Sequence, residues 1–304
     1  MPLDSFSDTE LILNADGSVY HLNLQPYQVA PTIITVGDPD RVSAVSQHFD
    51  TIEHKVQKRE FVTHTGRIGD KQLTVISTGI GTGNIDIVFN ELDALFNIDL
   101  AQKRVKKELT TLQFTRIGTS GCLQKEIPVD TVLVSEMAVG MDNLLAYYDS
   151  SSSEKEAAFH SKLSTFLEQE QGSLPTISNV TAANATLLNS LSEDFLKGIT
   201  LTCPGFYGPQ GRQLRAKNKV KNLLDLFSHF NAEQNRMSNK NEANSYPITN
   251  FEMETAGIYG MAKLLGHQAI SFNALLANRA TGEFSKTPKK TVKKMIERVL
   301  EKLT

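Results

Sequence analysis

The segment from Arg116 to Gly121 has the sequence RIGTSG and brings one guanidinium, two hydroxyls and two glycines together. Glycines let the backbone pass close to a ligand and turn its N–H groups outward, hydroxyls add donors, and arginine supplies a rigid fork of positive charge. This chemistry suits an anion, and phosphate is the natural one. A tight turn beside a surface ion pair has the same composition, so the segment by itself leaves both interpretations open.

A second anion site is predicted where the apolar run Thr32–Val36 ends in the sequence GDPDR. Gly37 frees the backbone at that point, Pro39 suits the first turn of a helix, and Arg41 follows one turn inside it. An ordinary strand-to-helix turn with Asp38 as its cap explains the same residues. The motif therefore gains weight only in combination with the others.

A glycine-rich stretch from Ser77 to Asn84 also follows an apolar run, and Arg59-Glu60-Phe61 precedes it. Its glycines stand at positions 79, 81 and 83, so the G-x-G-x-x-G spacing of a dinucleotide fingerprint fails. We discount a nicotinamide cofactor on that ground.

The segment from Phe206 to Arg212 offers an aromatic face, the amide of Gln210 and a guanidinium within one short turn. An aromatic ring can stack on a flat ligand, and an amide can both donate and accept. Together they suit a heterocycle that carries carbonyl groups. A glycine-proline turn with incidental polar neighbours is the alternative.

Two carboxylates, Glu252 and Glu254, flank Met253 just before the predicted helical run Ala256–Leu265. Acidic residues are common at helix starts because the helix dipole stabilises them. An ionised glutamate there could also accept hydrogen bonds from the vicinal hydroxyls of a ribose. Paired glutamates suit a glycosidase as well, with one as acid and the other as nucleophile or base, but that interpretation leaves the arginines unexplained.

The elements that must position these residues follow an α/β pattern. Apolar, β-branched runs predict strands at Thr32–Val36, Thr51–Val56, Leu73–Ser77, Leu112–Thr115, Thr131–Val134, Thr200–Thr202 and Ala269–Ala274. After a predicted N-cap at Asn84, apolar residues at 88, 92, 95 and 96 predict a helix that buries one face. The last helix is predicted from Thr287 as its cap, Pro288 in its first turn and an apolar stripe that ends at Leu303.

Composition limits the class of protein. A chain of 304 residues with 40% hydrophobic residues can bury a large core, and its net charge of -3 argues against a general nucleic-acid or membrane-surface binder. Two cysteines fit neither a disulfide framework nor a zinc site, and no secretory signal or membrane span is expected, so the predicted compartment is the cytoplasm. We predict one domain over residues 1–304, with an N-terminal extension at 1–20 and a flexible loop at 228–247 that could serve as a lid.

Taken together, eight segments in the same order resemble the nucleoside phosphorylase family, in its uridine phosphorylase branch. They are His21-Leu22-Asn23-Leu24, Gly37 to Arg41, Arg59-Glu60-Phe61, Ser77 to Gly81, Arg116 to Gly121, Phe206 to Arg212, Phe251 to Glu254 and Asn278-Arg279. The resemblance implies a three-layer α/β/α domain with a mixed, partly barrel-like central sheet, and an assembly of dimers, usually three forming a hexamer. It also implies reversible phosphorolysis, in which a nucleoside and inorganic phosphate give a free base and ribose 1-phosphate.

The resemblance also implies roles for individual residues. Phosphate would be bound by Gly37, Arg41, Arg116 and Thr119, with Arg59 from a neighbouring subunit. Ribose would be bound by Met253 and Glu254, and its 5′-hydroxyl by His21 of the neighbour. The base would be bound by Phe206, Gln210, Arg212 and Arg279. Catalytic roles fall to Arg116, Gln210, Arg212 and Glu254, because the reaction needs an anion below the anomeric carbon and positive charge near the departing base.

Two positions depart from the family pattern. The usual Tyr-Pro-Gly-Gln order becomes Tyr207-Gly208-Pro209-Gln210, which could reshape the base-binding turn. Asn84 stands where close relatives carry a serine near a monovalent cation, while Glu60 and Ile80 match that cation site. Potassium is therefore predicted as an optional ligand, inorganic phosphate as the co-substrate, and no other cofactor.

Three other functions remain open at this point. The purine branch has a similar helix start after Met253, but it uses an aspartate to protonate the base where this chain has Asn278, and the pair of Gln210 and Arg212 favours a pyrimidine. A hydrolytic nucleosidase would have no use for several phosphate-binding arginines. A noncatalytic nucleoside-binding protein would share the fold without turnover. The choice among uridine, thymidine and deoxyuridine lies below what motifs resolve.

Overall fold

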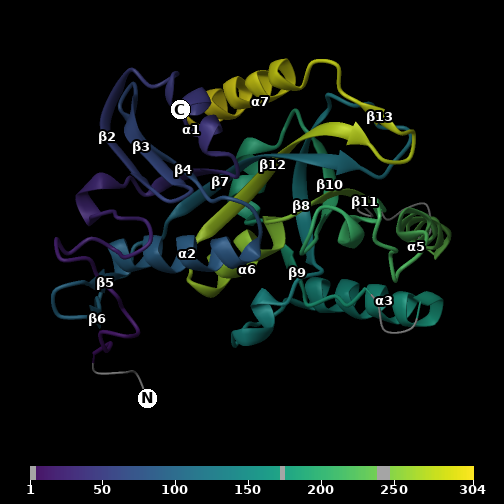
Figure 1. Cartoon of the computed structure of the whole chain (residues 1–304), viewed down its shortest axis with the longest axis horizontal. Helices are drawn as coiled ribbons and strands as arrows, with labels where there is room; N and C mark the ends of the chain where they lie inside the picture. Colours follow the sequence, from purple (N-terminus) through teal and green to yellow (C-terminus); the bar gives the residue numbers. More distant parts are fainter. Residues whose placement is uncertain (1–4, 172–174, 238–246) are drawn as a thin grey trace. The chain divides into compact units, whose positions relative to one another are not determined.

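The computed structural model describes residues 5–171, 175–237 and 247–304 (Figure 1). The chain divides into two compact units. The first unit consists of Met1–Ile117 and Met261–Ala269 with Thr304, and the second of Gly118–Gly260 and Ile270–Leu303. Both units combine helices with a mixed sheet. In the described part of the chain, no helix is long and apolar enough to cross a membrane.

The sheet of the first unit places five strands in the order β7-β1-β4-β3-β2. Their bounds are β1 Thr32–Val36, β2 Thr51–Lys58, β3 Phe61–Ile68, β4 Lys71–Ser77 and β7 Gln113–Cys122, of which the residues up to Ile117 belong to this unit. Strand β1 is buried along its whole length and runs parallel to both β4 and β7. Strand β3 runs antiparallel to β4 and β2. Loops that follow β1 and β4 therefore leave the same edge of the sheet.

Two helices and a short hairpin complete the first unit. Helix α1, Pro39–Ser46, begins at the predicted proline, and its N-cap Asp38 accepts a hydrogen bond from the backbone of Asp40. Helix α2, Thr82–Asn97, buries the predicted apolar face. Its N-cap is Gly81 at φ +93°, so the prediction of Asn84 as the cap is wrong: a glycine with positive φ begins the helix, three residues earlier than the polar side chain suggested. The hairpin pairs β5, Ile98–Asp99, with β6, Arg104–Val105.

The second unit has a larger mixed sheet in the order β13-β12-β8-β10-β11-β7, with β9 paired to β8. The bounds are β8 Val132–Gly140, β9 Asn179–Ala182, β10 Leu196–Thr202, β11 Ile248–Glu252, β12 Gln268–Asn278 and β13 Glu283–Phe284. Strand β10 runs parallel to β8 and β11, whereas β12 and β9 run antiparallel to β8. Residues from Gly118 onward carry β7 into this unit, where Gly121 pairs with Phe251.

The α-helices that lie in or begin in the described part of the second unit are α3 Glu154–Gln171, α4 Ala185–Leu191, α5 Leu223–Met237, α6 Thr255–Leu264 and α7 Pro288–Leu303. Helices α3 and α5 cover an apolar cluster that contains Leu163, Phe166, Phe227 and Phe230. Helix α7 begins at Pro288 and buries the predicted stripe, and it packs on α4.

The segment predicted as a flexible loop at 228–247 differs in the structure. Helix α5 extends to Met237, because apolar side chains such as Phe227 and Phe230 pack into the core at helical spacing while the opposite face is polar. Residues 238–246 of that segment lie outside the described residues, and Pro247 directly precedes β11. The first part of the segment is therefore an element of the fold.

Candidate active site

Three parallel strands of the first unit bring the predicted anion-binding residues together. Thr35 on β1 is in register with Arg116 on β7, and Val36 is in register with Ser77 at the end of β4. Because the carboxyl ends of parallel strands meet at one edge, Gly37 emerges beside the loop that follows β4. A Cβ atom at Gly37 would lie 3.4 Å from the carbonyl oxygen of Gly79, so the two loops approach closely.

Two guanidiniums are held at this edge. Arg116 is only 5% exposed, and it occupies the strand that lies next to β1. Arg41, in the first turn of α1, donates from Nη1 to the carbonyl oxygen of Ile117, the residue after Arg116, at 3.3 Å. Thr119 follows on the same strand and is partly buried in the second unit. The structure thus brings Gly37, Arg41 and Arg116 together within the first unit.

Arg59 occupies a different environment, at the exposed tip of the hairpin between β2 and β3. Its φ of 55° is in the left-handed region, which non-glycine residues adopt only when the surroundings impose it. Ser77 holds the residues that follow Arg59: its hydroxyl donates to the carbonyl oxygen of Glu60 at 2.6 Å and accepts from the backbone of Val62 at 2.7 Å. The hairpin tip is therefore fixed, and Arg59 is presented to solvent.

The predicted cation residues are brought together in part. Asn84 donates from its amide nitrogen to Oε1 of Glu60 at 3.2 Å, and a Cβ atom at Gly79 would collide with that amide at 2.5 Å. The side chain of Ile80 is 72% exposed. Among the residues described, no group of three or more His, Cys, Asp or Glu side chains is placed to hold a metal ion. Asn84 therefore supplies Glu60 with a neutral hydrogen-bond donor.

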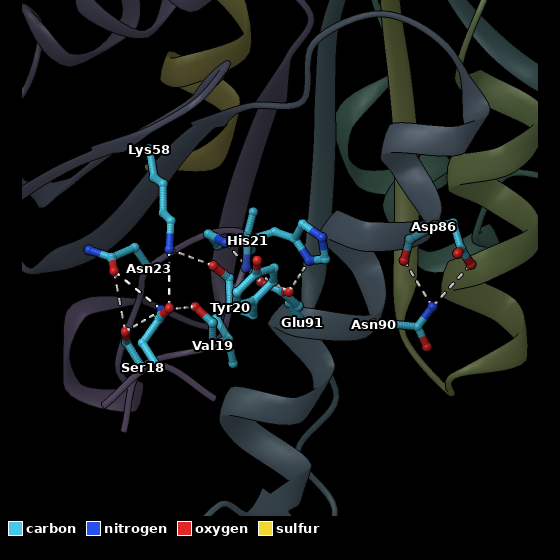
Figure 2. Close-up of polar contacts among 11 residues, drawn as sticks. Ser18, Val19, Tyr20, His21, Asn23, Lys58, Asp86, Asn90 and Glu91 are labelled. Carbon is cyan, nitrogen blue, oxygen red and sulfur yellow. Dashed lines mark hydrogen bonds and ion pairs between the residues drawn. The ribbon is translucent and has the colours of Figure 1, made fainter. Parts of the chain in front are cut away.

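His21 lies in a turn that is tied to helix α2 by one carboxylate (Figure 2). Glu91 accepts from Nδ1 of His21 at 2.6 Å, from the backbone N–H of His21 at 2.9 and 3.0 Å, and from the backbone N–H of Leu22 at 2.8 Å. The imidazole also meets the ring of Tyr20 edge-on, with centroids 4.9 Å apart. The second ring nitrogen points away from Glu91. The sequence motif identified His21 but gave no sign of its partner.

In the second unit, the two glutamates before helix α6 have separate roles. Glu252 accepts from the hydroxyl of Thr202 at 2.6 Å and from the backbone N–H groups of Glu254 and Thr255 at 2.9 Å. It satisfies the N–H groups at the start of α6, as an N-terminal cap does. Glu254 follows at the helix start, only 6% exposed, with Met253 partly buried beside it. Because Glu252 is committed to the backbone, the geometry disfavours the glycosidase pair.

The predicted base-binding residues form one tight cluster. Arg212 donates from Nη1 to the carbonyl oxygen of Phe206 at 2.7 Å and to Oε1 of Gln210 at 2.6 Å. Arg279 donates to the backbone oxygen of Gln210 at 2.9 Å, and a Cβ atom at Gly121 would lie 3.3 Å from the Arg279 side chain. The Arg212 guanidinium lies 3.8 Å from the centroid of the Phe206 ring. A base must therefore use the other face of Phe206 or displace the guanidinium.

This cluster is electrostatically unusual. Burial, with a further contribution from the positive charge of Arg279, lowers the pKa of Arg212 to about 10. Burial likewise lowers the pKa of Arg279. Two poorly solvated cations side by side are stabilised by any negative charge that develops next to them. The cluster is suited to a ligand that gains negative charge during a reaction.

The altered order Gly208-Pro209 builds a single turn of 3-10 helix over Gly208–Gln210. The turn buries the Gln210 side chain, which is 2% exposed, and Gly211 ends it at φ 72°. A pocket of about 700 Å³ opens beside this turn and is lined by Tyr207, Arg212 and Leu223, among others. In this turn Gln210 lies next to Arg212.

Asn278 serves the structure of the second unit. Its amide donates to the carbonyl oxygens of Gln124 and Ile127 at 2.9 Å, and its oxygen accepts from the backbone of Ala280 and Thr281 at 3.0 Å. These four bonds occupy both N–H groups and both lone pairs of the amide. Asn278 therefore holds the turn after β12 in place and has no proton to give as an acid.

Comparisons with known proteins identify the family of this chain. The family profile described as the Phosphorylase superfamily matches residues 31–304. The uridine phosphorylase of Thermococcus kodakarensis is 28% identical over 95% of this chain and 87% of its own length, and that of Haemophilus influenzae is 27% identical over 93% and 96%. A solved Trypanosoma brucei nucleoside phosphorylase, described as showing uridine phosphorylase activity, has 27% identity and a TM-score of 0.82 over 96% of this chain and 99% of its own. The predicted α/β class with a mixed, partly closed sheet is confirmed.

Proposed function

Because the chain belongs to the phosphorylase superfamily, we propose that it is a pentosyltransferase that catalyses the reversible phosphorolysis of uridine to uracil and ribose 1-phosphate. The base-binding cluster carries this proposal. When the glycosidic bond breaks, its electrons pass to the uracil ring and place negative charge on the carbonyl oxygens. Arg212 and Arg279 supply positive charge there before the reaction starts, so a separate general acid is not required.

In this proposal phosphate is the nucleophile. Gly37, Arg41 and Arg116 at the strand ends of the first unit would bind it, with Thr119 as a further donor. Bidentate arginines suit phosphate because their fork matches its oxygens. Arg59 would come from a neighbouring subunit, since its hairpin tip faces solvent.

The ribose would lie against Met253 and Glu254, with the carboxylate of Glu254 accepting hydrogen bonds from the vicinal hydroxyls. His21 of a neighbouring subunit would bind the 5′-hydroxyl. Sharing residues between subunits makes a dimer necessary for activity, and we propose an assembly of three such dimers. We propose that phosphate is the co-substrate and that the reaction needs no cofactor. We also propose that potassium can bind near Glu60 and that the protein is cytoplasmic.

A panel of nucleosides tests the proposal. Uridine, deoxyuridine, thymidine and inosine are each incubated with the enzyme in the presence and absence of inorganic phosphate, and release of the free base is measured by chromatography. We expect uracil from uridine only when phosphate is present. Cleavage of inosine without cleavage of uridine would identify a purine enzyme, and equal rates without phosphate would identify a hydrolase. Tight uridine binding without turnover would identify a binding protein.

A further inference from the structure

We propose that Glu91 is a positioning residue that fixes the proton of His21 on Nδ1 and thereby presents Nε2 as an acceptor for the 5′-hydroxyl of the substrate. This inference rests on the proposed function. It adds Glu91, from helix α2, to the residues proposed to recognise the 5′-hydroxyl of the nucleoside. Glu91 itself does not touch the substrate in this proposal.

The first argument is the set of donors around Glu91. Its two oxygens meet three N–H groups: the backbone of His21, the backbone of Leu22 and Nδ1 of the imidazole. Only an ionised carboxylate accepts at both oxygens, because a glutamine would turn its NH₂ group toward at least one of these donors. The site is therefore built for a carboxylate.

The second argument concerns the tautomer. A carboxylate has no proton to donate, so the 2.6 Å contact with the imidazole requires a proton on Nδ1. In the neutral ring this leaves the lone pair on Nε2, which points away from Glu91 (Figure 2). A nitrogen lone pair accepts a hydrogen bond from a hydroxyl. The geometry thus matches a 5′-hydroxyl as the donor.

The third argument is the rigidity of the turn that carries His21. Lys58 donates to the carbonyl oxygen of Tyr20 at 2.8 Å and to the side-chain oxygen of Asn14 at 3.1 Å, and Asn14 donates to the carbonyl oxygen of Val19 at 2.9 Å (Figure 2). These bonds fix the backbone on the N-terminal side of His21, independently of Glu91. Glu91 holds the next two residues through the backbone N–H groups of His21 and Leu22, and its bond to Nδ1 orients the ring on this fixed turn.

The fourth argument is access. The His21 side chain is 29% exposed and the Glu91 side chain is 14% exposed, so the imidazole is the more accessible of the two. Both line a groove of about 460 Å³ in the first unit. A ligand in that groove can therefore reach the ring, while most of the carboxylate surface is covered.

The experiment compares uridine with 5′-deoxyuridine, which lacks only the hydroxyl in question. In the wild-type enzyme we expect kcat/KM for uridine to exceed that for 5′-deoxyuridine by about tenfold, the contribution of one good hydrogen bond. Glu91→Gln and His21→Ala should each lower kcat/KM for uridine and leave 5′-deoxyuridine almost unchanged, so that the ratio falls toward one. The double variant should lose no more than either single one, because both act on the same contact.

Asp86→Asn is the matched control, since Asp86 is another carboxylate of helix α2 and contacts Asn90 rather than His21 (Figure 2). It should keep the wild-type ratio. A Glu91→Gln enzyme that loses the same factor on both substrates would overturn the inference and assign Glu91 a structural role. A wild-type enzyme that releases uracil from neither substrate would instead refute the proposed function.

A second measurement does not depend on turnover. In ¹⁵N-histidine NMR spectra, the His21 signals, assigned by their loss in His21→Ala, should show a protonated Nδ1 and an unprotonated Nε2 at alkaline pH. The Glu91→Gln variant should lose this preference. A wild-type His21 with its proton on Nε2 would refute the inference even if every variant folds and turns over normally.

Discussion

The arginines of the first unit and those of the second are held in opposite ways. Arg41 and Arg116 come from a helix and a strand and are anchored separately, while Arg59 stands alone on a hairpin tip. Arg212 and Arg279 instead share one residue, Gln210, which accepts from the first through its side chain and from the second through its backbone.

The two sets of arginines differ because phosphate and uracil become negatively charged at different stages of the reaction. Phosphate is negative before it binds, so dispersed arginines can gather around it. Uracil is neutral until the glycosidic bond breaks, so its arginines must be assembled in advance without a counter-charge. The pKa values of Arg212 and Arg279 are lowered because both guanidiniums are partly buried and therefore poorly solvated.

The largest effect should come from the first unit. Arg116→Ala is expected to lower kcat/KM for phosphate by roughly a thousandfold, because it removes a buried, charge-assisted contact to the nucleophile. Initial rates at varied phosphate measure it, and thermal unfolding shows whether the variant is folded. Arg116→Lys keeps the positive charge but loses the two-pronged guanidinium. Its kcat/KM for phosphate should lie between those of the wild type and Arg116→Ala. Near-normal phosphorolysis by a folded Arg116→Ala enzyme would contradict the phosphate assignment.

Arg212→Ala should lower kcat for uridine by roughly a hundredfold, since it removes charge stabilisation that matters only as the bond breaks. A uridine with an electron-withdrawing group at C5 yields a more stable uracil anion. The loss of kcat caused by Arg212→Ala should therefore be smaller with this substrate than with uridine. Arg116→Ala should show the same penalty with both substrates. If the loss of activity changes by the same factor between the two substrates in Arg116→Ala and in Arg212→Ala, the phosphate-binding and base-binding arginines do not differ as described.

Subunit mixing tests where Arg59 acts. Co-expression of Arg59→Ala and Arg116→Ala chains gives mixed oligomers in which about a quarter of the sites combine an intact Arg116 with an intact Arg59 from the neighbour. Activity should rise toward that fraction of the wild-type value, although each variant alone is nearly inactive. If the mixed oligomers stay as inactive as their parents, Arg59 serves its own subunit.

The smallest expected effect is an absence of reaction at Cys203. A thiol near two guanidiniums is usually activated, but burial dominates here and raises the pKa of Cys203 well above its ordinary value, with Glu252 adding to the rise. An aromatic disulfide reagent at pH 8 should leave this thiol unmodified in the folded enzyme and titrate it after unfolding. Rapid modification of the native enzyme would show that the base-binding cluster is more open than described.

The sequence predicted those elements whose signal is local. Strand β1 matches its prediction because an apolar run ends at a glycine and a helix-starting proline. Strand β3 was missed, since polar residues such as Thr63 and His64 occupy several of its buried positions. The N-cap at Asn84 was wrong because a glycine with positive φ begins the helix, which no side chain signals.

The residues of the candidate site also fall into two groups: those that a local sequence motif predicts and those that only the folded chain reveals. Motifs located Gly37, Arg116 and Arg212, because each stands in a short segment with its partners. Glu91 could not be found, because it lies 70 residues from His21 and meets it only in the folded chain. The separate roles of Glu252 and Glu254 were also hidden, since they depend on which carboxylate turns back to the helix start.

The turn that carries His21 precedes residues 31–304, the part of the chain that matches the family profile. It is attached to the first unit through hydrogen bonds to Lys58 and Glu91 and through the buried side chains of Val19, Leu22 and Leu24. For protein engineering, the turn around His21 is therefore the part of residues 5–30 to vary: a replacement that keeps these apolar side chains and the N–H donors to Glu91 should change which 5′ substituents are accepted, while the residues proposed for phosphate and base remain as they are.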